Sequence, residues 1–262
     1  MLSTYSLTII HCNAARYYQP NLSIWLSVDP MADKYPSMSP YTYCANNPVR
    51  LVDKDGREIW IVGEDGNRYK YCNGNVYTEN GTLYSPESGS FISNAKNAID
   101  VLKTTKTGNR LISNFEGYEN KDVYIESGTK SNCDNLKIDA NTKDFISETI
   151  YWNSNGTDLQ TTAGISKNAI TDLGHEFSHV YDDAKKIPNL FNSYYQGLSK
   201  SEWRASYKEN LIRQELKMPL RTTYSFSIQK SGGNRQQIQV SLLKKGAPYM
   251  PMEIMFTNYP VK

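Results

Sequence analysis

Residues that commonly build metal or redox sites are scarce in this sequence. Its 262 residues include three histidines and four cysteines, and Cys12, Cys44, Cys72 and Cys133 lie far apart along the chain. This spacing provides neither a close metal-binding pair nor a dense disulfide framework. We therefore expect mostly free, buried thiols.

The sequence also lacks an excess of either charge and any long hydrophobic run. Its formal net charge is +2, which argues against nucleic acid or an anionic bilayer as the principal partner. No apolar run approaches the length of a membrane span. The first residues carry no basic leader and no small-residue cleavage pattern, so we expect no signal peptide and export through a carrier or a larger precursor.

What is present is the composition of a globular chain with three differently patterned parts. Hydrophobic residues make up 39% and charged residues 21%, which is enough apolar material for a core. Residues 1–57 are rich in Tyr, Pro and Asn and have no sustained periodicity. The patterns predict a β-rich connector at 58–90 and a larger domain of helices and strands at 91–262, so the expected fold class is α+β.

Alternating residues and turn signals predict the strands, and a 3.6-residue period predicts the helices. The expected strands are 58–62, 68–71, 75–78, 123–125, 136–138 and 149–152, with a hairpin of 223–228 and 236–243. The expected helices are 91–105, 166–185 and 200–216. Residues 149–153 are a candidate edge strand for pairing with an extended substrate, although an ordinary core strand fits the pattern equally well.

The helix expected at 166–185 carries two of the three histidines. His175 and His179 lie about 40° apart around a helix and one turn above another, so both imidazoles can reach one zinc ion. Glu176 then lies beside the metal, where it can take the proton of a zinc-bound water that attacks a peptide carbonyl. The alternative is a histidine pair without a metal on an ordinary amphipathic helix.

A catalytic zinc site needs a third protein ligand. The remaining histidine, His11, lies in the N-terminal part, so we expect a carboxylate instead. Asp182 and Asp183 are close in sequence to the histidines. Asp183 could be the ligand itself or could form a hydrogen bond to one of the ligands. The second predicted helix offers Glu202, which we favour as the ligand, and Glu209, which could replace it or orient a histidine.

Three segments resemble the effector-type zinc metallopeptidases typified by type III secreted proteases of host proteins. They are residues 173–182, which contain both histidines, residues 209–213 and residues 219–224. In addition, Glu202 and Ala205 resemble the Glu-x-x-Ala of zinc peptidases whose glutamate ligand stands on a separate helix. The resemblance implies a zinc endopeptidase acting on a protein or peptide, with a zincin-like fold of an active-site helix, a ligand-bearing helix and a small mixed sheet.

The resemblance also assigns roles beyond the metal ligands. Arg221 and Tyr224 stand where the family has a matching arginine and tyrosine, and either could stabilise the oxyanion that develops during hydrolysis. Structural hydrogen bonding is the alternative role for both. The sequence departs from the family after the second helix, where Leu216 and Lys217 replace Leu-Gly at the helix C-cap.

The N-terminal part resembles the end of the Rhs repeat-associated core. The resemblance rests on Arg-Tyr-Tyr-Gln-Pro at 16–20, Trp-Leu-Ser-Val-Asp-Pro at 25–30 and Tyr-Thr-Tyr-Cys-Ala-Asn-Asn-Pro at 41–48, which occur in the family's order. In that family the shell can cut itself at Asp-Pro-x-Gly and release a C-terminal toxin. Asp53 matches the self-cleavage position, but Lys54 replaces the proline, and a plain Asp-Gly turn is the alternative.

Together the resemblances imply the toxin tip of a polymorphic toxin that is secreted or delivered by contact from a bacterial cell. Its implied partners are a larger Rhs shell or secretion machinery and a cognate immunity protein. Two other hypotheses fit the sequence. One is a non-enzymatic surface or adhesion module, and the other is a decayed Rhs module without a bound metal.

Overall fold

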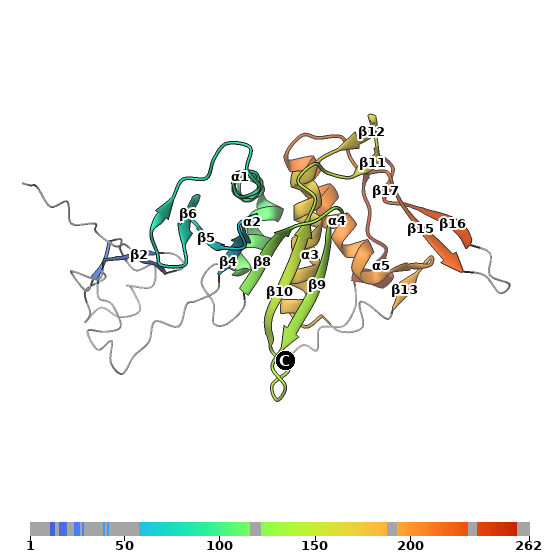
Figure 1. The fold of residues 1–262 in the computed structure, drawn as a ribbon. Helices are drawn as coiled ribbons and strands as arrows, with labels where there is room; N and C mark the ends of the chain where they lie inside the picture. The colour runs from blue at the N-terminus through green and yellow to red at the C-terminus, as the bar shows by residue number, and fades with distance from the viewer. Residues whose placement is uncertain are drawn as a thin grey trace, which may run out of the picture.

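The computed structural model of the chain describes residues 11–13, 16–19, 24–26, 28, 39, 41, 58–115, 122–187, 193–229 and 235–255. Over these residues the fold mixes helices with a mixed sheet, as the sequence predicts (Figure 1). Asp53, Lys54 and most of the segment that resembles the Rhs core lie outside the described residues. His11 lies in a small sheet of β1 (His11–Asn13), β2 (Arg16–Gln19) and β3 (Ile24–Trp25).

Among the described residues, a seven-stranded sheet forms the centre of the fold, in the order β7-β6-β5-β4-β8-β10-β9. β8 pairs in parallel with β4 and with β10, and the other neighbours are antiparallel. The strands are β4 (Ile59–Val62), β5 (Arg68–Cys72), β6 (Asn75–Thr78), β7 (Leu83–Tyr84), β8 (Asp122–Ser127), β9 (Asn132–Ile138) and β10 (Phe145–Trp152).

The sheet extends one expectation and decides between two alternatives that the sequence left open. The meander expected at 58–90 forms, and its first strand, β4, pairs with β8, so these residues belong to the same sheet as the strands of 91–262. Residues 149–153 do not form an edge strand, because β10 is hydrogen-bonded to β8 on one side and to β9 on the other. The strand at that end of the sheet is β9.

Two long helices cross the sheet region next to each other. α3 (Ala169–Ala184) packs on β9 and β10, and α4 (Lys200–Glu215) packs on α3 (Figure 1). The other helices are α1 (Phe91–Lys103), α2 (Lys106–Ile112), the 3-10 helix η3 (Ser113–Phe115) and the short α5 (Met252–Met255). The three helices predicted from periodicity form within a few residues of their expected bounds. α2, with seven residues, is too short to show a period.

Side-chain caps fix where the two long helices begin. The Asn168 side chain accepts a hydrogen bond from the backbone N–H of Thr171 at 2.9 Å at the start of α3. At the start of α4, the Ser199 hydroxyl accepts one from the N–H of Glu202 at 3.2 Å. Such caps satisfy N–H groups that have no partner within the helix, and the second cap fixes the position of Glu202.

The structure shows the backbone conformation at the end of α4, at the position where the family that the sequence resembles has glycine. Lys217 has φ 56°, in the left-handed region. Its N–H donates to the carbonyl of Gln214 at 3.1 Å, and the N–H of Met218 donates to that of Arg213 at 2.8 Å. These two bonds form a Schellman motif, in which glycine is the usual left-handed residue. The motif therefore forms here with lysine.

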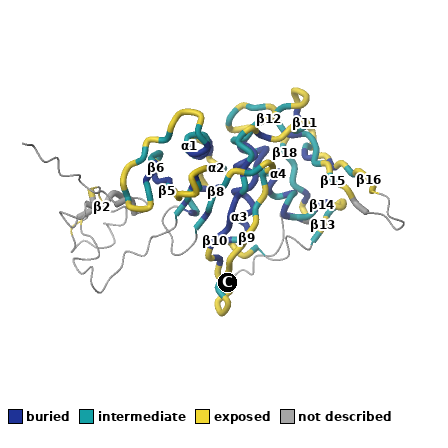
Figure 2. Tube along the Cα trace, viewed as in Figure 1, coloured by how far each residue is buried: buried dark blue, intermediate teal, exposed yellow. Residues whose placement is uncertain are grey.

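A hydrophobic core lies between the sheet and the helices, where the tube of Figure 2 is dark blue along α1, α3 and β8. Its large side chains include Trp152, Phe115 and Phe177, each at most 1% exposed. Gly174 lets α4 approach, because a Cβ there would lie 2.8 Å from Cδ1 of Ile212. A larger residue directly before His175 would therefore have to displace the end of the Ile212 side chain in the packed core.

Four hairpins complete the described fold. They are β11 (Asp158–Thr161) with β12 (Gly164–Lys167), β13 (Tyr194–Tyr195) with β14 (Leu198–Ser199), β15 (Thr223–Gln229) with β16 (Arg235–Ser241), and β17 (Leu243–Lys244) with β18 (Ala247–Pro248). The third is the hairpin expected from the sequence. A second apolar cluster around Trp203, Val240 and Leu242 packs the β13–β14 and β15–β16 hairpins against α4.

The cysteines differ from one another in state. Cys133, on β9, is free, as expected. Cys72, at the end of β5, is disulfide-bonded, so the expectation of a free thiol is wrong there. Spacing along the chain could not show this, because disulfide formation depends on which segments the fold brings together.

Candidate metal site

The two histidines of α3 face each other across one helical turn. Nε2 of His175 and Nε2 of His179 are 3.3 Å apart, and both residues are under 9% exposed. A tetrahedral zinc ion about 2.0–2.1 Å from each nitrogen would separate the two by roughly 3.4 Å. The spacing predicted from the helix period is therefore realised in a geometry that suits one ion.

α4 supplies the third group. Oε2 of Glu202 lies 3.1 Å from Nε2 of His175, and Oε1 lies 3.6 Å from Nε2 of His179. One ligand atom from each of the three residues lies within 4.8 Å of the others, so the group could hold a metal ion. Two neutral nitrogens and one carboxylate are a common ligand set of catalytic zinc, and the donor set fits the ion that the sequence predicts.

Partners on the far side of each imidazole hold the rings in place. Nδ1 of His179 lies 2.7 Å from the Ser201 hydroxyl, and Nδ1 of His175 lies 3.2 Å from Oε2 of Glu209. With each Nδ1 engaged in this way, both Nε2 atoms face the same point. Hydrogen bonds of this kind fix the ring orientation and the tautomer of metal-binding histidines.

Glu209 thus lies behind a ligand and does not belong to the group of ligand atoms. It is fully buried, with Oε1 accepting from Nε of Arg213 and Oε2 accepting from Nη1 of Arg221, each at 2.8 Å. Of the two roles left open for Glu209 by the sequence, this geometry corresponds to orientation of a histidine.

The charges of the site stabilise one another without a metal. Burial lowers the pKa of His175, but hydrogen bonds to Glu202 and Glu209 outweigh it and raise the pKa to about 10. Burial likewise raises the pKa of Glu202, yet its hydrogen bonds to His175 and His179 hold that pKa well below its ordinary value. A divalent cation that replaces the proton of His175 would find a carboxylate already ionised.

Glu176 lies beside the histidines, with 7% of its surface exposed. The Cys133 thiol, from β9, donates to Oε2 of Glu176 and to its backbone carbonyl, both at 3.4 Å. Burial and then the charge of Glu176 raise the pKa of the thiol well above its usual value, so Cys133 stays protonated and can donate. Sequence reasoning missed this contact, because a lone cysteine 43 positions away carries no signal for it.

A cavity of about 130 Å³ opens next to His175 and Glu176, and Arg221 and Tyr224 line it. The guanidinium of Arg221 lies 4.5 Å from the centre of the Tyr224 ring, and Nη1 is bonded to Glu209. Burial, followed by the negative charge of Glu202, raises the pKa of Tyr224, which therefore remains a hydrogen-bond donor. The structure thus brings both residues to the site and gives Arg221 structural partners.

The two aspartates at the end of α3 lie outside the group of ligand atoms. Asp182 accepts from Nε of Arg204 at 2.8 Å and from Nζ of Lys208 at 2.7 Å. Asp183 lies beside Glu148 of β10, and burial raises its pKa to about 6. Glu148, which sequence reasoning also missed, is buried, and burial and then the charge of Asp183 raise its pKa to about 9.

Comparisons with known proteins match only a small part of the chain. No protein-family model and no solved structure matches it. A segment of 55 residues is 42% identical to the tRNA(Glu)-specific nuclease WapA of Bacillus subtilis subsp. natto (strain BEST195). That match covers 20% of this chain and 2% of the nuclease. In the described part of the chain, no helix is both long and apolar enough to cross a membrane.

Proposed function

We propose that the protein is a zinc-dependent endopeptidase that hydrolyses a protein of a target cell, with Glu176 as the general base. The observation that carries the proposal is the convergence of His175, His179 and Glu202 beside Glu176. A zinc ion at such a site lowers the pKa of a bound water to about 7 and polarises a carbonyl oxygen. Two histidines on one helix and a glutamate on a second helix support a zincin-like fold.

The side chains around the site suit peptide hydrolysis. Glu176 has a carboxylate that can accept the proton of the attacking water and pass it to the leaving amine. The Cys133 thiol holds that carboxylate from behind. Tyr224, kept protonated by its surroundings, can donate a hydrogen bond to the developing oxyanion, and Arg221 supplies positive charge beside it.

β9 offers a place for the substrate. It is the end strand of the sheet on the side of α3, most of its residues are exposed, and its Cys133 contacts Glu176. An extended peptide could pair with the free edge of β9 and thereby pass close to the histidines. We therefore assign to β9 the substrate-pairing role that the sequence suggested for residues 149–153.

The biological setting follows from the two resemblances and is part of the proposal. We infer that residues 1–57 are the remnant of an Rhs core and that the protein is delivered from a bacterial cell as a toxin tip. A cognate immunity protein and a larger shell or secretion machinery are its proposed partners. The nuclease to which a fifth of the chain is similar acts on tRNA by its name, so RNA cleavage is the activity to test beside proteolysis.

Substitution of Glu176 by Gln tests the proposal. We expect the unaltered protein and Glu176→Gln to bind about one zinc per chain each, because the ligand atoms are unchanged. Its cleavage of a mixture of unfolded protein substrates should fall by at least about 100-fold, since a general base contributes 10²–10⁴-fold. Zinc is measured by atomic absorption, and cleavage by mass spectrometry of the peptides.

A matched control and two contrary outcomes make the test decisive. Glu87→Gln, an exposed change far from the site, should leave cleavage intact. Protein prepared without chelator that contains no metal would contradict the proposal and favour a decayed or non-enzymatic module. Cleavage of tRNA that depends on Glu176, with no peptide hydrolysis, would replace the endopeptidase by a nuclease.

A further inference from the structure

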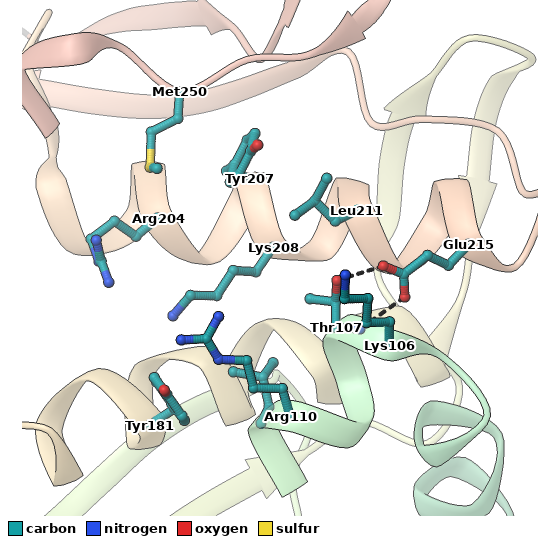
Figure 3. A pocket seen from close by; sticks show the side chains of 11 residues that line it. Lys106, Thr107, Arg110, Tyr181, Arg204, Tyr207, Lys208, Leu211, Glu215 and Met250 are labelled. Atoms are coloured by element: carbon teal, nitrogen blue, oxygen red, sulfur yellow. Dashed lines mark hydrogen bonds between the residues drawn. The ribbon is translucent and has the colours of Figure 1, made fainter. Parts of the chain in front are cut away.

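A second cavity, of about 380 Å³, lies on the opposite side of α4 from the metal site. Residues project from a helix at about 100° intervals. Arg204, Lys208 and Leu211 therefore share one face of α4, and Glu202 and Glu209 share the opposite face. The first face lines the cavity together with residues of α2 and α3, as Figure 3 shows.

Four cations line this cavity, namely Lys106, Arg110, Arg204 and Lys208. Arg204 and Lys208 come from α4 and both bond to Asp182 behind them. Arg110 comes from α2, and its guanidinium points toward the ammonium end of Lys208 in the middle of the cavity (Figure 3). Burial lowers the pKa of Lys208 to about 8, and repulsion by Arg204 and Arg110 acts in the same direction.

The carboxylates nearby do not balance this charge. Asp182 is the shared hydrogen-bond acceptor of both Arg204 and Lys208. Glu215 accepts from the N–H of Thr107 at 2.9 Å and from its hydroxyl at 2.7 Å (Figure 3). Within the described residues, the side chains of Lys106 and Arg110 make neither a hydrogen bond nor an ion pair. Among the described residues, the cavity therefore holds more positive than negative charge, and a dianion would correct the difference.

The remaining walls are apolar or aromatic. Tyr181, Tyr207, Leu211 and Met250 line the cavity, and the ammonium group of Lys208 lies 4.9 Å from the centre of the Tyr181 ring. A concave space of several hundred Å³ with apolar walls and a few convergent polar groups is typical of small-molecule sites. Arginine forks and lysine ammonium groups together are typical of phosphate recognition.

We propose that this cavity binds a small phosphorylated molecule with an aromatic or apolar body. Arg110, Lys106 and Lys208 would hold the phosphate groups, and Tyr181 and Tyr207 would contact the body. The site is separate from the metal ligands and does not depend on the proposed hydrolysis. An acidic segment of a protein partner is a different occupant, and the experiment below distinguishes it.

Calorimetric titration of the full chain, freed of metal with a chelator, tests the proposal. ATP serves as the phosphorylated aromatic probe, pyrophosphate as the anion alone and adenosine as the uncharged body. We expect measurable binding of ATP, weaker binding of pyrophosphate and none of adenosine. The double variant Lys106→Gln/Arg110→Gln should weaken ATP binding by at least about tenfold, because two positively charged donors to the phosphate groups are lost.

The control removes the same two kinds of charge from other exposed positions. Lys130→Gln/Arg235→Gln keeps the net charge equal to that of the first double variant and should bind ATP within about twofold of the unaltered protein. Equal weakening in both variants would overturn the proposal, and so would no binding of ATP or pyrophosphate at millimolar concentration. Tighter binding of a ten-residue glutamate peptide than of ATP would also overturn it, in favour of a protein partner. None of these outcomes depends on zinc or on peptide cleavage.

Discussion

Glu209 shows how a carboxylate without any exposed surface supports the group of residues that could hold a metal ion. It receives hydrogen bonds from Arg213 and Arg221 and lies behind His175. Each arginine is itself mostly buried, so the carboxylate is the compensating charge for both. Removing that charge leaves two cations in a region of low dielectric.

We predict that Glu209→Gln destabilises the metal-free protein by about 3 kcal/mol, because breaking a buried ion pair costs this much. The same change should weaken zinc binding by roughly 10–100-fold, since His175 loses the partner that orients it. Urea unfolding and a competitive zinc titration measure the two effects separately.

Glu202→Gln is the matched comparison. The side chain of Glu202 is 30% exposed, against 1% for Glu209, so the loss of stability in the metal-free state should be smaller. The loss of zinc affinity should be larger, because a direct ligand is changed. The opposite order of the two variants in either measurement would contradict the roles that we assign to them.

A second prediction concerns Glu148 and its buried neighbour Asp183. Burial and the Asp183 charge raise the pKa of Glu148 to about 9, against 4.5 in an unfolded chain. The folded protein therefore keeps a proton that the unfolded chain releases, and stability falls as pH rises from 4.5 to 9. Glu148→Gln, which resembles the protonated acid, should be more stable than the unaltered protein at pH 8 by more than about 1 kcal/mol.

The difference should become much smaller as pH falls to 5, because the folded protein is then uncharged at this position and the pH is close to the pKa of 4.5 in the unfolded chain. Urea unfolding at pH 5 and pH 8 provides the measurement. Glu79→Gln, at an exposed position, should show no such pH-dependent gain. A Glu148→Gln protein that is less stable than the unaltered one at pH 8 would show that the ionised carboxylate is needed there.

At the scale of single elements, the left-handed residue at the end of α4 leads to a stability prediction. Lysine at φ 56° has a Cβ that crowds the backbone, and glycine avoids this cost. We expect Lys217→Gly to stabilise the protein by about 0.5–1 kcal/mol in thermal or urea unfolding. Leu216→Gly, one residue earlier at φ −83°, gains nothing and should destabilise instead. A loss of stability in Lys217→Gly would mean that its side chain makes a contact worth more than the strain.

Local patterns were sufficient to predict the three longest helices and the longer strands, and most of the short strands and the short helices were missed. The apolar stripe of α3 follows from near neighbours, and so does the meander of β4, β5 and β6. His175, His179 and Glu176 could be predicted for the same reason, because their arrangement is set by one helix. Glu202 required a resemblance, since nothing local indicates that the start of α4 faces α3.

Pairings across long separations could not be predicted. The pattern of β10 does not show whether a strand lies on one side of it or on both, and this is why the sequence left the edge strand and the core strand open. Cys133 beside Glu176 and Glu148 beside Asp183 are likewise contacts between distant segments. A buried polar residue and an exposed one look alike in a single sequence, so these neighbours become visible only in the fold.

At the scale of the whole molecule, the proposed metal would connect two helices. His175 and Glu202 are 27 positions apart, and an unfolded chain does not hold them together. Zinc at 100 times its dissociation constant should therefore stabilise the protein by about 2.7 kcal/mol, which corresponds to a rise in Tm of roughly 5–10 °C for a chain of this size. Calorimetry with zinc and with a chelator measures the shift, and an unchanged Tm would show that no ion binds.

The position of α4 as a wall shared by two sites has a thermodynamic consequence. A ligand in the second cavity that changes the tilt or rigidity of α4 also changes the position or mobility of the carboxylate that faces the histidines. Free energy around a closed cycle must sum to zero, so the influence has to be mutual. If a phosphate compound raises the affinity of the protein for zinc by some factor, zinc must raise the affinity of the protein for that compound by the same factor.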